Sequence, residues 1–306
     1  YGRVNENPLG AGPIGGTSMK IDRQSTGKML GLKGIVENSI DATTTRDSAV
    51  EYIAAIAILM TNLSRVSKDF SIWSTSEFSF LQLSDEFSSP SSVMPQKKNP
   101  DILELTRGKT SHVIGNLTSM LSTIQGLPSG YSRDLQQINP SIWSASKIAI
   151  SALLVMESML KSVIINKKNM KKAAEDGYLI ALDLAEKLVH NGISFRKSHQ
   201  IIGRLVKIAH KSGKPISELN KSEIKKEIKG KEVSLELLIK LIKSTTITSS
   251  LHDRTSQGSS GISEQKRMIK HRLGKINAYQ TGIKNRSDYV QNSLNKLNKK
   301  VKALIK

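Results

Sequence analysis

Ile148-Ala-Ile-Ser-Ala-Leu-Leu-Val-Met156 is the longest apolar stretch of this 306-residue chain. It lies within a longer pattern, Trp143 to Ile165, that is typical of a helix with apolar residues on nearly every side. Such a helix is buried within a bundle and does not lie on its surface. Charged Lys147 and Glu157 bound the stretch, which is well short of the roughly 20 residues that a membrane crossing needs. We therefore expect a bundle helix and no membrane span.

Two further segments have the same helical period. Asp47 to Phe70 repeats apolar residues at i, i+3 and i+4, and Asp101 to Ile124 does so directly after Pro100, which favours a helix start. Strand-like alternation is almost absent from the chain. We predict an all-α protein built on a bundle of long helices, and the very apolar helix suggests that subunits share the core of that bundle.

The chain changes character after the third long helix. Asn166-Lys-Lys-Asn169 interrupts the apolar pattern, and shorter helical patterns follow, separated by turns that contain glycine. We predict a central bundle domain over 1–169, a small C-terminal helical domain over 170–265 and a tail over 266–306. The helices expected in the small domain are Leu179 to His190, Phe195 to Lys211, Ser217 to Lys225 and Ser234 to Lys243.

The tail is basic and has a heptad pattern. From Lys266 to Lys306 it carries twelve Lys or Arg side chains and one acid, Asp288, which gives a local charge of +11. Apolar residues fall on one a/d frame, as in a coiled coil, although Gly274 and Gly282 each cost about 1 kcal/mol within a helix. We predict a coiled-coil-like helix whose seam packs against another helix of the same protein or binds an acidic partner.

The charge of the whole chain, +20, raises nucleic acid as a partner. More than half of that excess lies in the tail, aromatic content is 4%, and no nucleic-acid recognition motif accompanies the charge. We expect a solvated basic face and no specific nucleic-acid binding. The chain has no Cys, which excludes disulfides and is compatible with a cytoplasmic location.

Cofactor and metal signals are weak. The six His residues never fall into a close ligand spacing, so we predict no metal site. Gly10-Ala-Gly-Pro-Ile-Gly15 matches the dinucleotide pattern G-x-G-x-x-G, which works only between a strand and a helix. The preceding residues do not form a core strand and Pro13 stands inside the motif, so we predict no cofactor.

One loop carries a specific signal: Ser88-Ser-Pro-Ser-Ser-Val-Met-Pro-Gln-Lys-Lys-Asn-Pro-Asp101. Its composition alone is that of a solvated connection that stiffens at its prolines. Its wording, however, resembles the signature Gly-Ser-Ser-x-x-Pro-x-Lys-x-Asn of the fumarase, aspartase and argininosuccinate lyase superfamily. The sequence Met-Pro-Gln-Lys-Lys-Asn-Pro-Asp is similar to that of the argininosuccinate lyases. The matching positions are Ser91, Ser92, Pro95, Lys97 and Asn99.

The resemblance extends over nearly the whole chain. Asp41-Ala-Thr-Thr-Thr-Arg-Asp47 resembles the family's Asp-Ala-Thr-x-x-Arg-Asp, and Gly126 to Gln136 is similar to a stretch specific to argininosuccinate lyases. Phe195 to His199 and Arg254 to Gly258 are similar to parts of the family's carboxy-terminal domain. Only the tail after about residue 275 lies beyond the resemblance.

The resemblance implies a cofactor-free lyase that cleaves argininosuccinate reversibly into arginine and fumarate, as a cytoplasmic homotetramer whose sites are shared between subunits. It implies Ser91 as the base and Lys97 as a catalytic cation. A serine can act as a base only if its alkoxide is stabilised, which backbone amides and cationic neighbours can do. The residues that the resemblance places at the substrate are Asn99, Tyr131, Gln136 and Arg46.

Three features keep other functions open. Pro90 stands where the family has Gly, Asn139 stands where it has Lys, and the family's Thr-His-x-Gln motif does not occur in residues 1–306. We expect from this that the acid side of the reaction is absent from this stretch of chain. The alternatives are an inactive or structural relative like the lens crystallins, another superfamily lyase that acts on a succinyl substrate, and a basic nucleic-acid binder.

Overall fold

The computed structural model describes the whole chain except residues 1, 92, 95–97, 177, 229–232 and 306. The described residues form twelve α-helices, four short 3-10 helices and only three pairs of two-residue strands. The prediction of an all-α fold with a long-helix bundle is thereby confirmed. The chain divides into two compact units, Tyr1–Ile165 with Gln280–Lys306 as unit 1 and Asn166–Tyr279 as unit 2.

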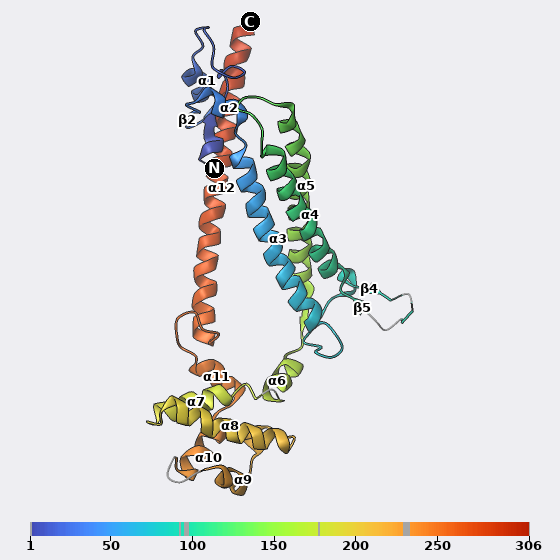
Figure 1. The fold of residues 1–306 in the computed structure, drawn as a ribbon, viewed down its shortest axis with the longest axis vertical. Helices are drawn as coiled ribbons and strands as arrows, with labels where there is room; N and C mark the ends of the chain where they lie inside the picture. The colour runs from blue at the N-terminus through green and yellow to red at the C-terminus, as the bar shows by residue number, and fades with distance from the viewer. Residues whose placement is uncertain (1, 92, 95–97, 177, 229–232, 306) are drawn as a thin grey trace. The chain divides into compact units, whose positions relative to one another are not determined.

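Unit 1 is built on three long helices that pack side by side, each antiparallel to its neighbour in sequence (Figure 1). They are α3 (Asp47–Trp73), α4 (Asp101–Ile124) and α5 (Ile138–Ser162). Its shorter elements are η1 (Arg3–Asn5), β1 (Glu6–Asn7), α1 (Arg23–Leu30), β2 (Gly34–Ile35), α2 (Ser39–Thr44), β3 (Leu81–Gln82), η2 (Asp85–Phe87), β4 (Ser89–Pro90), β5 (Lys98–Asn99), η3 (Arg133–Gln137) and β6 (Ile164–Ile165). β1 pairs parallel with β2, and β3 pairs antiparallel with β6.

The third long helix starts five residues before its predicted start and ends before its predicted end. α5 begins at Ile138, and Ile164 and Ile165 form a strand and not the last helical turn. Pro140 falls in the first turn of α5, where its missing N–H has no helical partner to lose. Pro140 is therefore compatible with a helix that starts at Ile138.

The core of unit 1 lies between the facing sides of the three helices. Fully buried Ile53 and Met60 of α3 pack in one cluster with Val113 and Met120 of α4 and with Ala145 of α5. Full burial of an Ile, Met or Val side chain stabilises the fold by about 1.5–3 kcal/mol.

The outward sides of the helices are also apolar. Ala149, Ala152 and Met156 of α5 are buried, but Ile150 and Leu154 are 59% exposed. One chain alone therefore buries only one side of Ile148 to Met156, and the expected sharing of the core between subunits stays a prediction. Apolar residues on adjacent faces of one helix need cover from more than one direction, and α3 and α4 cover only one of them.

By length and composition alone, two helical stretches could cross a membrane: Asp47–Trp73 and Arg133–Ser162. The continuous apolar run is short, but each stretch has an 18-residue part that is apolar on average and holds at most two charged residues. Helices of a shared bundle pass the same test. Only 22% and 28% of the two windows are buried within the chain, so both helices have apolar surface that this chain leaves uncovered.

Unit 2 has its own core of short amphipathic helices. Leu184 and Leu188 of α7, Ile201 and Leu205 of α8 and Leu238 of α10 are fully buried or nearly so. The helices of unit 2 are α6 (Lys167–Asp176), α7 (Ala181–His190), α8 (Phe195–Lys211), η4 (Ile216–Glu218), α9 (Lys221–Glu227), α10 (Leu235–Ser244), α11 (Ile247–Asp253) and the first part of α12 (Ile262–Ile305). The apolar pattern of the sequence did not predict α6 and α11.

The helix predicted over Ser217 to Lys225 is displaced. A short 3-10 helix ends at Glu218, and α9 begins only after Asn220. Asn220 and Glu223 form a reciprocal capping box, in which each side chain accepts from the other residue's backbone N–H. This pair fixes the helix start. At the start of a helix the backbone N–H groups of Asn220 and Glu223 have no acceptor within the helix, and the two side chains supply one to each.

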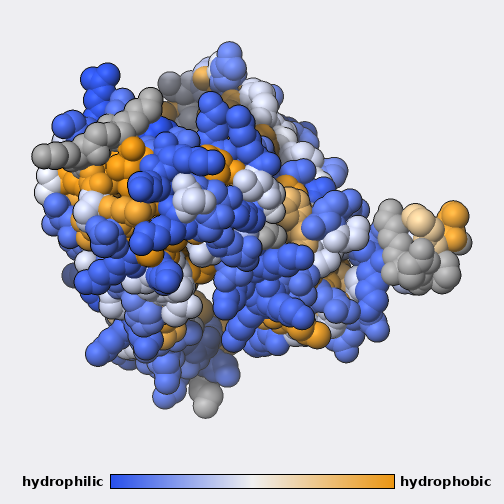
Figure 2. All heavy atoms as spheres, turned by 90° about the horizontal axis from the view of Figure 1, so that it is seen from below, coloured by the Kyte–Doolittle hydropathy of each residue, from blue (hydrophilic) through white to orange (hydrophobic). Residues whose placement is uncertain are grey.

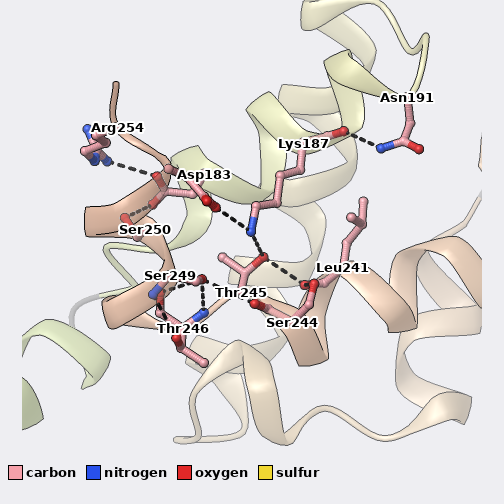
Figure 3. A network of polar contacts seen from close by, with 11 residues as sticks. Asp183, Lys187, Asn191, Leu241, Ser244, Thr245, Thr246, Ser249, Ser250 and Arg254 are labelled. Atoms are coloured by element: carbon pink, nitrogen blue, oxygen red, sulfur yellow. Dashed lines mark hydrogen bonds and ion pairs between the residues drawn. The ribbon is translucent and has the colours of Figure 1, made fainter. Parts of the chain in front are cut away.

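A polar network joins α7 to α11 and the residues on either side of it (Figure 3). The carboxylate of Asp183, which is 4% exposed, accepts a hydrogen bond of 2.7 Å from the Ser250 hydroxyl. It also pairs with Arg254 at 3.2 Å. One turn further along α7, the ammonium of Lys187 reaches Thr245 at 3.1 Å and Asp253 at 3.0 Å. The residues that precede α12 are thus held on α7 by charge-assisted contacts.

The tail belongs to one continuous helix, α12, of 44 residues, and Gly274 and Gly282 lie inside it. None of its described residues is buried. Seam residues such as Ile269, Leu273 and Ile283 are more than half exposed. The helix that the heptad pattern predicts is present, and what covers its seam stays a prediction, as does the division of the chain at residues 170 and 266.

Candidate active site

The predicted site residues fall into two groups at opposite ends of the bundle (Figure 1). Ser91 and Asn99 come just before α4 and form what we call the base half. Arg46, Tyr131 and Gln136 lie by the start of α3 and between α4 and α5, and form the binding half. α4 has 24 residues, so the two halves are separated by about 36 Å along its axis. One copy of this chain cannot bring them together.

The base half lies on a hairpin. Ser89 pairs with Asn99 and Pro90 with Lys98 in the antiparallel strands β4 and β5. Pro90, which replaces the family's Gly, is accommodated at this strand position. The hairpin projects from the bundle, and apolar surface lies near its tip, where Val93 is 84% exposed (Figure 2).

Ser91 follows the first strand of this hairpin. Its hydroxyl oxygen accepts hydrogen bonds from the backbone N–H groups of Val93, at 3.2 Å, and Met94, at 3.1 Å. Two backbone donors aimed at one oxygen stabilise a negative charge on it. Lys97 lies outside the described residues. The neighbouring Lys98 is exposed and pairs with the carboxylate of Asp85.

The binding half begins at Arg46, the residue before α3. Its guanidinium donates to the carbonyl oxygens of Thr43, at 3.1 Å, and Thr45, at 2.9 Å, and so is held against its own turn. The carboxylate of Asp41 accepts from the Thr45 hydroxyl and, at 2.7 and 2.8 Å, from Arg3. The Thr45 hydroxyl, and after it the Arg3 guanidinium, hold the pKa of Asp41 below its usual value. Asp41 therefore remains ionised and fixes the turn that presents Arg46.

Tyr131 and Gln136 lie together in the connection between α4 and α5. The amide nitrogen of Gln136 donates to the Tyr131 hydroxyl at 2.6 Å, and the Tyr131 side chain is 52% exposed. The preceding residue, Gly130, donates its backbone N–H to the Thr44 hydroxyl at 2.8 Å. This bond places the connection on the end of α2, two residues from Arg46. The structure thus brings the three predicted residues of the binding half to one end of the bundle.

Sequence reasoning missed Asp41 and Thr44 as parts of this site. Both lie within the Asp41 to Asp47 stretch that resembles the family motif, of which only Arg46 was predicted to lie at the substrate. The signal was the run of three threonines, Thr43 to Thr45, because each hydroxyl takes a different partner.

A hollow of about 370 Å³ lies elsewhere in unit 1, between the N-terminal segment and α12. Its lining includes no residue of either half of the predicted site. Its lining residues are Asn5, Gly31, Lys33, Asn285, Arg286 and Tyr289. Among the described residues, no three carboxylate or imidazole side chains gather closely enough to hold a metal ion.

Comparison with protein families gives two matches. Residues 1–115 match the family described as lyase, and residues 178–245 match the family described as argininosuccinate lyase C-terminal. The first match contains the base half and Arg46, and the second lies in unit 2.

Individual relatives agree with these matches. The chain is 60% identical over 305 residues to an argininosuccinate lyase of Nitrosopumilus maritimus, with 100% of this chain and 63% of that protein covered. An argininosuccinate lyase of Clostridium tetani is 43% identical over 223 residues, which cover 73% of this chain and 51% of that protein. The chain thus spans less than two thirds of the length of the curated relatives that it matches.

A solved structure has the same fold. An EDDS lyase variant with bound fumarate superposes with a TM-score of 0.85 and 25% sequence identity, over 100% of this chain and 61% of that one.

Proposed function

The chain belongs to the argininosuccinate lyase family, and from that premise we propose that it is part of an enzyme that reversibly cleaves argininosuccinate into L-arginine and fumarate. This reaction would place the protein in arginine biosynthesis. We also propose a cytoplasmic location. The 60% identity over the whole chain is the observation that carries the proposal. The placement of Ser91 beneath two backbone donors supports it.

The proposed chemistry is an elimination that needs no cofactor. Ser91, as alkoxide, takes the proton from the carbon next to the carboxylate that becomes an aci-anion. Asn99 and Lys97 hold that carboxylate while its negative charge grows. The electron pair then forms the carbon–carbon double bond of fumarate and the carbon–nitrogen bond breaks. The nitrogen keeps the electrons of that bond, takes a proton from an acid that residues 1–306 are not expected to supply, and leaves as part of arginine.

The binding half suits the rest of this substrate. Arg46 offers a planar fork that pairs with a carboxylate in two places, which a Lys cannot do. Tyr131 and Gln136 offer a hydroxyl and an amide to its polar groups. Asn139, exposed in the first turn of α5, leaves this end of the bundle without the lysine found in the family.

We propose that the two halves meet between copies of the chain, in a homotetramer. A second copy that runs antiparallel to the first would bring its base half to the first copy's binding half. Such packing would also cover the apolar outward faces of the helices, including Ile58 of α3, Leu105 of α4 and Trp143 of α5, which are all more than half exposed. Association of this kind needs no membrane, and we propose none as a partner.

The proposal is tested on the full-length protein that contains this chain, with argininosuccinate as substrate and the appearance of fumarate as the signal. Ser91→Ala is expected to lower kcat by about 10²- to 10⁴-fold, because a positioned base contributes that much. Ser88→Ala is the matched control, since its hydroxyl donates to the Ser84 carbonyl and leaves the backbone donors untouched.

Cleavage that survives Ser91→Ala would reject Ser91 as the base. A full-length protein with no activity would favour the inactive, crystallin-like alternative, for which Pro90 is a sequence feature, whereas Asn139 bears on the identity of the substrate. Cleavage of another succinyl compound, with argininosuccinate untouched, would favour a different lyase of the superfamily.

A further inference from the structure

We infer that Thr44 is a positioning residue of the site: its hydroxyl holds the α4–α5 connection, and with it Tyr131 and Gln136, in register with Arg46. This inference rests on the proposed function and adds a residue to it. Thr44 would touch no substrate. It would act through the backbone of Gly130.

The contact joins segments that are 86 residues apart in sequence. The Gly130 N–H donates to the Thr44 hydroxyl at 2.8 Å, a good distance for this type of bond. Gly130 is buried, so its N–H would lose its partner and gain little contact with water if the hydroxyl were removed. Its φ of +111° is open to glycine and strained for other residues, so the variants change Thr44 and leave Gly130 in place.

The anchor matters because packing alone does not hold Tyr131. Its ring is half exposed, and the polar contact recorded for its hydroxyl is with Gln136 in the same connection. Buried Leu135 fixes the far end of the connection, and the bond from Gly130 fixes the near end. Without the near anchor, Tyr131 and Gln136 could move together while their mutual hydrogen bond stayed intact.

The residues on the other side of Thr44 are held independently. Arg3 and Thr45 bind Asp41, and Arg46 binds the carbonyl oxygens of its own turn. Thr44 therefore extends from a turn that is already fixed. A shift of the connection would change the distance from Tyr131 to Arg46, and not the position of Arg46 itself.

The glycine-rich turn that resembles a dinucleotide motif has a place in this arrangement. Gly12 has φ of +72°, and a Cβ there would lie 2.5 Å from the Gly16 carbonyl oxygen, so the turn closes tightly on itself. Ile14, at its tip, lies against Gly130, with side-chain atoms 3.5 to 3.8 Å from where a Cβ would be. The turn thus covers the backbone at the anchor with an apolar side chain, and a hydrogen bond shielded from water is stronger.

The test compares three variants of the full-length protein. Thr44→Val keeps the shape of the side chain and removes the hydroxyl. Thr44→Ser keeps the hydroxyl. Thr43→Val is the matched control, because the Thr43 hydroxyl donates to carbonyl oxygens of its own helix, at Ser39 and Ile40, and not to the connection.

Two measurements decide the outcome: steady-state cleavage of argininosuccinate, and amide hydrogen exchange of a peptide that contains Gly130. Thr44→Val is expected to lower kcat/KM about ten-fold, chiefly through KM, and to speed exchange at Gly130, because a buried donor is left without its partner. Thr44→Ser is expected to stay within about two-fold of wild type, and Thr43→Val to leave both measurements unchanged. Thr44→Ala repeats the comparison if Thr44→Val does not fold.

Unchanged exchange at Gly130 in Thr44→Val would overturn the inference, and so would faster exchange with unchanged kcat/KM. A loss of kcat/KM in Thr43→Val as large as in Thr44→Val would also overturn it, because the effect would then come from the helix and not from the anchor. A wild-type protein that does not cleave argininosuccinate would instead overturn the proposed function. The two failures are thereby distinguishable.

Discussion

Replacement of Asp183 by alanine is expected to destabilise unit 2 by about 3 kcal/mol. Asp183 is 4% exposed and accepts from Ser250 at 2.7 Å and from Arg254 at 3.2 Å. A hydrogen bond to a buried charged group is worth about 1.5–3 kcal/mol, and loss of one leaves the Ser250 hydroxyl, which is also buried, without its acceptor. The Arg254 side chain is 33% exposed, so water partly replaces the lost ion pair, and we assign it no more than about 1 kcal/mol.

Two further variants separate these contributions. Asp183→Asn keeps an oxygen that can accept from Ser250 but loses the charge, so about half of the destabilisation is expected. Ser250→Ala removes the donor alone. The double variant with Asp183→Ala should lose less stability than the two single variants lose together, because both substitutions remove the same bond.

Stability is measured on the whole chain by urea unfolding, with amide exchange of the α7 peptide as the local signal for unit 2. The reasoning is refuted if Asp183→Ala changes the free energy of opening of α7 by less than about 1 kcal/mol. It is refuted equally if the effects of Asp183→Ala and Ser250→Ala are additive within about 0.5 kcal/mol, since residues that share a bond are coupled.

Two other predictions concern assembly and pH. Leu154→Asp puts a charge on the exposed apolar face of α5 and is expected to shift the full-length protein from the proposed tetramer to smaller species in light scattering. Lys161→Ala, at the exposed end of α5, is the control and should leave the size unchanged. An unchanged size in Leu154→Asp would show that this face is not an interface. The Asn220 N–H, and after it the Lys214 ammonium, hold the pKa of Glu223 below its usual value. The carboxylate therefore stabilises α9 at any pH above the pKa that Glu223 has in the unfolded chain, and this stabilisation is lost as the pH falls through the lower pKa of the folded protein. The difference in thermal midpoint between wild type and Glu223→Gln should therefore be full at pH 7 and shrink below about pH 4, and a difference that stays constant down to pH 3 would contradict this linkage.

The sequence predicted the helices well where periodicity was strong and poorly where a local cap set the boundary. Asp101 to Ile124 was found with both ends correct, because Pro100 marks its start and the apolar period is regular. The start of α9 was missed although Asn220 and Glu223 have the spacing of a capping box, a signal that is present in the sequence and outweighs weak periodicity. Continuity of α12 through Gly274 and Gly282 shows that two unfavourable residues do not end a helix of this length.

Sequence could name candidate site residues but could not place them. Ser91 and Tyr131 are 40 residues apart along the chain, yet a whole helix separates them, because α4 lies between the hairpin and the connection. Periodicity also showed that α5 is apolar on nearly all sides, but not that Ile150 and Leu154 face away from this chain's own core. If the chain assembles as proposed, both gaps have one cause: the pattern of one chain indicates that a surface is covered, but not which copy of the chain covers it.

The distance between the two halves makes the length of α4 a condition of the proposed chemistry. One residue added to α4 would move the hairpin by about 1.5 Å along the axis and turn it by about 100°, which points Ser91 away from its former direction. A substitution on the surface of α4 has no such effect, because the rise and rotation per residue stay the same. Lineages of this protein should therefore accumulate replacements within the long helices. Insertions should fall in unit 2 or in the loops, where they change neither the length nor the rotation of α4 and so do not move Ser91, the proposed base.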